Sequence, residues 1–451
     1  MAFLTILDMN SSALCLNEGR WEDIAISGFC YFALPIVLAG LAIQYILFVR
    51  DPKPPPNFGG YARPGFEAVR EAFRRNFEDG LEPDGAAFAL CHRGELVVDL
   101  WGGYADKMAL RPWKEDTMTV VFSATKGASA LVIAMLVDRG LLKYDDLVTK
   151  HWPEFGAHGK ANVTIKMLIG HEAGLAALDE PITKDAVRDW RRMSELFENQ
   201  EPNWPPGTDA GYHALTFGWL CDQLVRRVDP KHRSLGHFFS EEIAQPFGID
   251  FYIGLPRHQL YRVARMTGGS LWDFLRRLDD WRNIRAFLSF VWNRKPLLDK
   301  VIANPDWLRA NSEAFTYNDP EVLELEIGGA NGVGTARAVA QLYCLLDGTA
   351  LLNRSTLDII SQPALWTESD RVMGMPSHWG WGLVHTRNPQ GQYQVGHCGH
   401  GGQNAKFDPH ERLAIAYIRN NMAPFTGEFT RSFRDLQDAA YECVKAVKTK
   451  G

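Results

Sequence analysis

Residues 121–127 read Val-Phe-Ser-Ala-Thr-Lys-Gly, and an apolar run from Ala128 to Val137 follows them. The spacing of the apolar side chains predicts a buried helix that begins near Ser123 and stops at Gly140. On such a helix Ser123 and Lys126 share one face. The N-terminus of a helix favours negative charge, and burial disfavours a protonated lysine. The stretch therefore predicts a nucleophilic serine with a lysine as its base.

A serine with a lysine three positions later is a weak pattern by itself, because a serine that caps a helix, followed by a solvent-exposed lysine, has the same spacing. Two features favour the catalytic interpretation. Ser123 is the only serine in the chain with a lysine at that spacing. Lys126 also opens a run that is too apolar for a solvated surface helix.

The composition is that of a folded protein with a large core. The 451 residues can form one large two-lobed unit or more than one domain, and they are 46% hydrophobic and 23% charged. The net charge of −6 and the absence of a long basic run argue against a nucleic-acid partner. None of the seven cysteines forms a C-x-x-C pair, which indicates buried or free thiols rather than a zinc site or a disulfide framework.

The N-terminal region contains an uncharged run of 26 residues, Ile24–Val49. At about 1.5 Å per residue such a helix can cross a hydrocarbon core of about 30 Å, so the run predicts a single transmembrane helix. A cleaved signal peptide is the alternative. The run is longer than a signal-peptide core, and acidic residues precede it, which favours the anchor.

The side of the membrane that holds the rest of the chain stays open. More basic residues follow the run than precede it, which favours a cytoplasmic location. Glycosylation sequons begin at Asn162 and Asn353, and these would matter only on the lumenal or extracellular side. The expected location is therefore a membrane with one crossing, with the side undetermined.

Strand signals lie at both ends of the part that follows residue 60, and helical signals dominate between them. Strand-like runs occur at 86–90 and 95–100, joined by His92-Arg93-Gly94 and followed by Trp101-Gly102-Gly103 and a polar loop that leads to Ser123, and again at 381–384, 393–397 and 413–418. Helical patterns cover 66–77, 214–228, 271–292 and 429–447. The order predicts a sheet made from both ends of the chain, with a helical block inserted between them.

Four further motifs accompany the serine and lysine. In chain order they are Leu168-Ile169-Gly170-His171-Glu172-Ala173-Gly174-Leu175, Trp204-Pro205-Pro206-Gly207, Tyr212-His213-Ala214-Leu215-Thr216-Phe217-Gly218-Trp219 and Gly396-His397-Cys398-Gly399-His400-Gly401-Gly402. With Ser123-Ala124-Thr125-Lys126, they resemble the class C β-lactamase-related serine hydrolases, and most closely the family VIII carboxylesterases of that fold. The resemblance covers roughly residues 60–440.

The resemblance implies an α/β (α+β) fold of the β-lactamase/transpeptidase type, with an antiparallel sheet flanked by helices and an inserted all-helical lobe. It also implies ester hydrolysis through an acyl-enzyme on Ser123. Lys126 would accept the serine proton, and Tyr212 would share it and pass it to the leaving group. No cofactor and no metal are expected.

The resemblance also assigns the last motif to the substrate pocket. The backbone N–H groups of Ser123 and His400 would form the oxyanion hole. His397 and Gly399 would lie beside it, with Gly399 allowing close backbone approach.

Two departures from class C β-lactamases favour an esterase. Those enzymes carry Tyr-x-Asn where this chain has Tyr212-His213-Ala214, so an amide that binds the lactam side chain and orients the lysine is missing. Their last motif begins with lysine, and here it begins with His397. The alternatives are a β-lactamase or peptidase-like amide hydrolase, and a catalytically silent membrane-associated scaffold, which would have no need of Ser123, Lys126 and Tyr212 together.

The sequence thus predicts a membrane-anchored serine hydrolase that acts on a small-molecule ester, with no nucleic-acid partner and with its oligomeric state open. The predicted parts are a tail at 1–23, a transmembrane helix at 24–49, a proline-rich linker at 50–60, a catalytic domain at 61–440 with its helical lobe at about 140–325, and the end of the C-terminal helix and a tail at 441–451.

Overall fold

The first two long strands form a hairpin around two residues with positive φ. Strand β2 (Gly85–His92) is followed by Arg93 (φ 54°) and Gly94 (φ 80°), and β3 (Glu95–Asp106) returns antiparallel to it. Positive φ at both loop residues matches the twist of antiparallel strands. This hairpin confirms the prediction, but β3 runs past the predicted strand end at Leu100 as far as Asp106, because it also pairs with β1 and β4.

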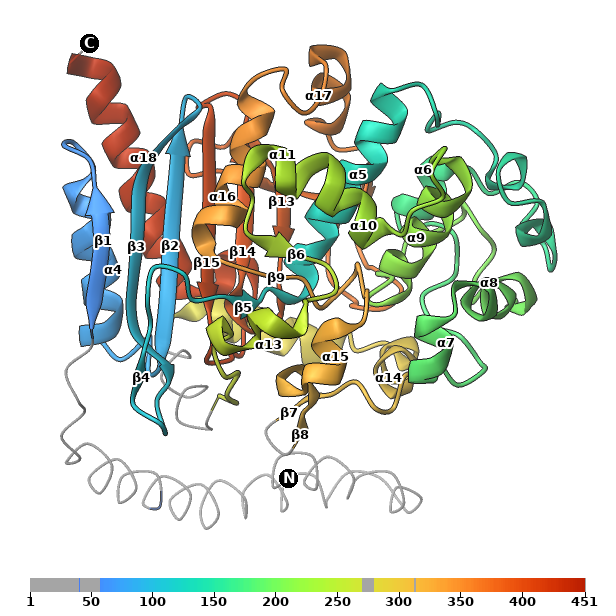
Figure 1. The fold of residues 1–451 in the computed structure, drawn as a ribbon, viewed down its shortest axis with the longest axis horizontal. Coiled ribbons are helices and arrows are strands. Elements are labelled where there is room, and N and C mark those ends of the chain that lie inside the picture. The colour runs from blue at the N-terminus through green and yellow to red at the C-terminus, as the bar shows by residue number, and fades with distance from the viewer. Residues whose placement is uncertain (1–39, 41–56, 270–279, 312–313, 451) are drawn as a thin grey trace, which may run out of the picture. The chain divides into compact units, whose positions relative to one another are not determined.

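A computed structural model describes residue 40 and residues 57–269, 280–311 and 314–450. Residues 56–451 form a compact unit of their own. Within the described residues, a ten-stranded antiparallel sheet has the order β1-β3-β2-β15-β14-β13-β12-β11-β10, with β4 paired to β3 (Figure 1). Its other strands are β1 (Phe58–Ala62), β4 (Arg111–Pro112), β10 (Leu365–Thr367), β11 (Ser377–Gly380), β12 (Leu383–Arg387), β13 (Tyr393–Cys398), β14 (Asn404–Asp408) and β15 (Leu413–Arg419).

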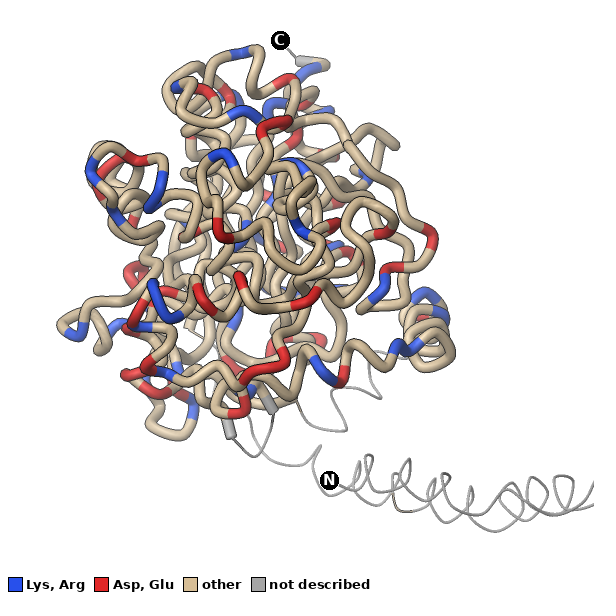
Figure 2. Tube along the Cα trace, turned by 90° about the vertical axis from the view of Figure 1, so that its right-hand side faces the viewer, with Lys and Arg blue, Asp and Glu red and all other residues tan. Residues whose placement is uncertain are grey.

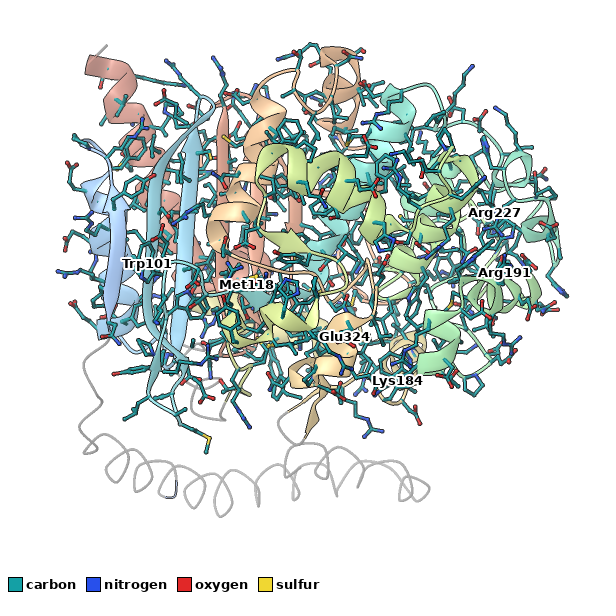
Figure 3. The ribbon with its side chains drawn as sticks, viewed as in Figure 1. Trp101, Met118, Lys184, Arg191, Arg227 and Glu324 are labelled. Atoms are coloured by element: carbon teal, nitrogen blue, oxygen red, sulfur yellow. The ribbon has the colours of Figure 1, made fainter. Side chains whose placement is uncertain are left out.

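The centre of the sheet joins the two ends of the chain, as the sequence predicts. Strand β15 pairs with β2, with Ala416 opposite Ala89. Strand β1 takes in residues 58–60, which the sequence assigned to the linker, and Gly59 leaves room there for the ring of Trp101 on β3 (Figure 3). Among the described residues the sheet therefore begins at Phe58, a few positions before the predicted boundary.

Each face of the sheet is covered by helices. Phe88 and Leu90 point to one face, where they pack with α4 (Glu67–Glu78) and α18 (Arg431–Lys450). Ala87 and Ala89 point to the other, and their small side chains let α16 (Ala336–Cys344) lie close to the sheet. Helix α17 (Arg354–Ile360) lies at the upper edge in Figure 1. The alternation of side chains along a strand thus separates two apolar cores.

The inserted lobe is mainly helical and packs on α5 (Thr125–Asp138) through α9 and α10. Its helices are α6 (Ile165–Ile169), α7 (Lys184–Arg188), α8 (Trp190–Asn199), α9 (Thr216–Val228), α10 (Leu235–Phe239), α11 (Gln245–Phe247), α13 (Trp281–Trp292), α14 (Pro296–Ala303) and α15 (Pro320–Glu324). Arg227 of α9 lies over the ring of Trp152 at 4.2 Å from its centroid, which ties α9 to the outer turns of this lobe (Figure 3).

Short strands in this region support the start of α5. The strands β5 (Thr119–Val120), β9 (Val333–Gly334) and β6 (Phe251–Tyr252) form a small sheet, and β7 (Ala310–Asn311) pairs with β8 (Ala314–Phe315). Because β5 ends three residues before Ser123, this small sheet fixes the backbone that leads into the serine.

Several predicted boundaries shift by a few residues. The third predicted helix is described only from Trp281, as α13, and its first part lies outside the described residues. Trp381, a predicted strand residue, has φ 59° in the turn between β11 and β12. Strand β14 was not predicted, because its buried Asn404 and Lys406 interrupt the apolar pattern of a central strand.

Among the described residues no helix is both long and apolar enough to cross a membrane. Apart from Gly40, the run Ile24–Val49 lies outside the described residues, so the anchor stays a prediction. In the view of Figure 2, basic and acidic positions are interspersed and no broad basic stripe is visible, in line with the absence of a nucleic-acid footprint in the sequence.

Candidate active site

Ser123 lies in a tight turn immediately before α5. The turn is one unit of 3₁₀ helix, Phe122–Ala124, and Phe122 has φ 46°, a left-handed conformation that costs a bulky residue about 1–3 kcal/mol. Neighbouring hydrogen bonds stabilise it: the hydroxyl of Thr125 donates to the Phe122 carbonyl at 2.5 Å, and the N–H of Gly332 donates to that hydroxyl at 2.8 Å. The turn holds Ser123 half-buried at the wall of a cavity.

Lys126 is fully buried beside the serine, as the sequence predicts. Its Nζ lies 3.3 Å from Ser123 Oγ and donates to the carbonyl oxygens of Ala214 and Gly329, each at 2.6 Å. The sequence suggested that Ala214, in place of an asparagine, leaves the lysine without an orienting partner. The structure differs, because two backbone carbonyls orient the amine without an amide side chain.

Burial lowers the pKa of Lys126 to about 7. Its neighbours are carbonyl dipoles rather than carboxylates, so little charge compensates for the lost hydration. A neutral amine is therefore well populated near neutral pH, which a general base requires.

Tyr212 completes the arrangement from the other side. The Lys126 Nζ lies 4.8 Å from the centroid of its ring. Burial raises the pKa of the Tyr212 hydroxyl, and a hydrogen bond with Ser123 opposes that rise. The ring stacks on Trp379 of β11 with centroids 5.4 Å apart and planes at 7°. The three predicted catalytic side chains thus meet at one point.

The loop that carries Tyr212 is fixed by a buried carboxylate. Oδ1 of Asp370 accepts hydrogen bonds from the backbone N–H groups of Tyr212 (3.1 Å), Val372 (2.8 Å) and Met373 (2.8 Å). Asp370 is fully buried, and desolvation raises its pKa. One carboxylate therefore ties the tyrosine loop to the segment before β11.

Two buried histidines hold the other side of that loop. Nδ1 of His213 donates to the Gly211 carbonyl at 2.7 Å, and its Nε2 accepts from the N–H of Leu175 at 3.0 Å. Nδ1 of His171 accepts from the N–H of His213 at 3.2 Å. Burial lowers the pKa of His213 to about 4, so this side chain is a neutral structural link at neutral pH.

In the glycine-rich motif 396–402, one histidine lines the cavity and the other is buried behind Tyr212. His400 is exposed and lines the cavity, with its ring 5.8 Å from that of Phe122. His397 differs from expectation: it is 2% exposed, stacks behind Tyr212 at 6.0 Å, and donates from Nδ1 to the Cys398 carbonyl at 2.6 Å. Desolvation, with the nearby Lys126 charge, lowers the pKa of His397 well below its usual value.

Gly399 lies against the backbone that precedes the serine. A Cβ at this position would be 2.2 Å from the Val121 carbonyl oxygen, so only glycine fits there. The assignment of the backbone N–H groups of Ser123 and His400 to an oxyanion hole stays a prediction.

The cavity beside Ser123 has a volume of about 630 Å³ and a mainly apolar wall. Apolar side chains from α13, α14 and their surroundings form that wall: Phe290, Leu298, Val301, Ile302, Leu308, Tyr317 and Met373. Asp306 and Arg309 are the charged side chains among its described residues. The described residues as a whole contain no group of three or more His, Cys, Asp and Glu side chains that could hold a metal ion.

Sequence reasoning missed three groups that position the site. The three groups are the Gly329 carbonyl, which binds Lys126, and the side chains of Asp370 and Trp379, which contact Tyr212. Each is 150 or more positions away in the sequence from the residue that it contacts, and none belongs to a motif that predicts the contact. Only Trp379 had a local signal, because it lies in the aromatic and glycine-rich run from His378 to Gly382.

Comparison with known proteins identifies relatives along nearly all of the described chain. A family model described as Beta-lactamase matches residues 73–439. The protein named esterase/beta-lactamase LipL of Mycobacterium tuberculosis is 33% identical over 380 residues, which are 80% of this chain and 83% of that protein.

Solved structures give the same result. A family VIII carboxylesterase superimposes with a TM-score of 0.74 at 32% identity, over 86% of this chain and 100% of that one. A penicillin-binding protein homologue from Caulobacter crescentus superimposes with a TM-score of 0.71 at 31% identity, over the same shares of the two chains.

Proposed function

Because the chain belongs to the β-lactamase family of serine hydrolases, we propose that it is a carboxylesterase that works through an acyl-enzyme on Ser123. The observation that carries the proposal is the environment of Lys126 Nζ. A neutral amine has two N–H groups and one lone pair. Because the carbonyls of Ala214 and Gly329 accept the two N–H groups, the lone pair faces Ser123 Oγ.

Acylation follows from this geometry. Oγ of Ser123 attacks the ester carbonyl carbon as its proton passes to Lys126 Nζ. The backbone N–H groups of Ser123 and His400 bind the oxyanion that forms. Collapse of this intermediate breaks the bond to the alcohol oxygen, which takes the proton from Lys126 through Tyr212.

Deacylation uses the same groups in reverse order. Lys126 is neutral again and accepts a proton from an attacking water, and the second tetrahedral intermediate collapses to release the acid and the Ser123 hydroxyl. Tyr212 keeps its own proton between steps, because burial raises its pKa.

An ester suits this site better than a β-lactam. Class C β-lactamases carry a lysine where this chain has His397, and His397 is buried and neutral, so it cannot hold the carboxylate of a lactam antibiotic as that lysine would. Ala214 has no side-chain amide to bind an acylamino group, and the cavity wall is mainly apolar. The relatives are named for both activities, so the alternative of lactam hydrolysis is tested directly.

The test compares two chromogenic substrates on the purified 57–451 fragment. We expect kcat/KM for a short-chain p-nitrophenyl ester to exceed that for nitrocefin at least about tenfold, or ~1.4 kcal/mol in transition-state stabilisation. If kcat/KM for nitrocefin is equal to or higher than that for the ester, the enzyme is a β-lactamase and the esterase proposal is wrong.

We also propose that the run Ile24–Val49 anchors the enzyme in a membrane, on the strength of its length and lack of charge. Full-length protein should then resist carbonate extraction, while the 57–451 fragment is soluble and active. Release of the full-length protein from membranes by carbonate alone would contradict the proposed anchor.

A further inference from the structure

Helix α13 exposes most of its large apolar side chains. The exposed ones are Trp281 (65%), Ile284 (41%), Leu288 (59%), Val291 (47%) and Trp292 (91%). At about 100° per residue they fall within one arc of roughly 100° on the helix. Single exposed apolar residues are ordinary, but a continuous stripe on one helix marks an interaction surface. We call these five residues the α13 face.

The side of α13 opposite the stripe is buried against the protein. Asn283 and Ala286 are buried, and the helix packs against the turn Gly427–Phe429. Asp280, at its N-terminus, accepts from the side chain of Arg434 on α18. The helix is therefore anchored on one side, and the apolar stripe turned away from that side is left uncovered by the described part of the chain.

Helix α13 carries both the α13 face and part of the cavity wall. Phe290 lines the cavity from a side of the helix about 100° away from Val291 of the exposed stripe. On α14, Ile302 is 65% exposed and also lines the cavity. The cavity at Ser123 therefore has an apolar side chain at the outer surface, where the apolar part of an ester can enter.

The chemistry of α13 matches a helix that lies in a membrane interface. Tryptophans stand at both ends of the stripe, where their amphipathic rings suit the headgroup region. Arg285 is exposed at the border of the stripe, where it can meet anionic headgroups, and Arg282 is exposed beside it and pairs with Asp280 at 3.2 Å. Apolar surface with aromatic and basic borders favours a lipid surface over a polar protein partner.

We propose that the α13 face docks on the surface of a phospholipid bilayer and opens the cavity to esters held in that bilayer. The docking stands independently of catalysis. The assignment of a lipid-borne ester as substrate rests on the proposed function. The substrate class is then an ester with a long apolar acyl chain.

The test is flotation of the 57–451 fragment, which contains both apolar cores, with vesicles of phosphatidylcholine and phosphatidylglycerol. We expect the wild-type fragment to float. A triple variant, Ile284→Gln, Leu288→Gln and Val291→Gln, changes only exposed side chains and should lower the bound fraction at least tenfold. The matched control is Ile359→Gln with Trp366→Gln, which are 44% and 50% exposed on α17 and β10 and should leave flotation unchanged.

Activity separates the two parts of the proposal. The triple variant should hydrolyse a soluble short-chain ester like wild type, and lose at least tenfold in turnover of a long-chain p-nitrophenyl ester in vesicles. Ser123→Ala should float but hydrolyse neither ester. If wild type floats and hydrolyses neither ester, the proposed function fails while docking stands.

Three results would overturn the docking. The first is a wild-type fragment that does not float, and the second is a triple variant that floats equally well. The third is a wild-type dimer without vesicles that the triple variant converts to a monomer in sedimentation, because the α13 face then belongs to a second copy of the chain.

Discussion

Lys126 gives the site its dependence on pH. Burial lowers its pKa to about 7, and only the neutral amine can accept the proton of Ser123. We therefore expect kcat/KM for a neutral ester to rise with pH through about 7 and to level off above it, since this ratio reports the free enzyme. Circular dichroism over the same range checks that the fold is constant. Activity that is flat from pH 5 to 9, or that falls as pH rises through 7, would contradict Lys126 as the base.

The sequence could place the catalytic side chains but not the groups that orient them. Ser123 and Lys126 are three positions apart, so local helix geometry alone brings them together. The Gly329 carbonyl is 203 positions from Lys126, and its role depends on backbone geometry that no side chain encodes. For His397 the motif led to the wrong position. The sequence motif predicted that His397 lines the substrate pocket, but in the structure it is packed behind Tyr212.

At the scale of elements, the loop of Tyr212 depends on the carboxylate of Asp370. Asp370→Ala leaves three backbone N–H groups without their acceptor, a cost of about 1–3 kcal/mol for each buried group. We expect kcat to fall at least tenfold with little change in KM, because Tyr212 shifts while the cavity wall is retained. Asp370→Asn keeps Oδ1 and should recover much of the loss. Equal losses in both variants, or a change confined to KM, would speak against this positioning role.

Elements with a simple pattern were predictable, and those that depend on neighbours were not. The β2–β3 hairpin and α4 follow from local alternation, a two-residue turn and helical spacing. Strand β14 has buried polar residues, and these are stabilised by distant partners: Lys406 Nζ donates to the hydroxyl of Thr386 on β12 and lies 3.3 Å from the carboxylate of Glu428. The physical cause of the missed strand is thus tertiary pairing.

At the scale of the molecule, a buried ion pair joins the two ends of the chain. Arg419 at the end of β15 and Glu82 before β2 are both fully buried, with 3.1 Å between Nη1 and Oε1. Removing one partner of such a pair costs about 3–5 kcal/mol, so Arg419→Met should lower the free energy of unfolding by that amount in urea. The control Arg63→Met removes an exposed pair with Glu95 and should cost less than about 1 kcal/mol. A similar small loss for both variants would refute this role for the pair.

The order of signals along the chain was enough to predict the architecture of the described domain. Strands at both ends with helices between them predict one sheet built from both termini, and β15 paired with β2 confirms it. The cavity could not be predicted, because its wall combines residues of the Phe122–Ala124 turn, the Tyr212 loop, α13 and α14 that only the fold brings together. The α13 face was missed for the same reason: the sequence shows an apolar stripe but not which part of it the protein covers.

The central claim is that Ser123 forms a covalent acyl-enzyme, and site mapping of that adduct tests it most directly. The wild-type 57–451 fragment is treated with a fluorophosphonate, weighed by intact-protein mass spectrometry, and digested to locate the label. The account predicts one adduct per chain, on the Ser123 hydroxyl, with loss of p-nitrophenyl ester hydrolysis in proportion to labelling, and no adduct or hydrolysis in folded Ser123→Ala. An adduct on another residue, or ester hydrolysis that persists in Ser123→Ala, would contradict it.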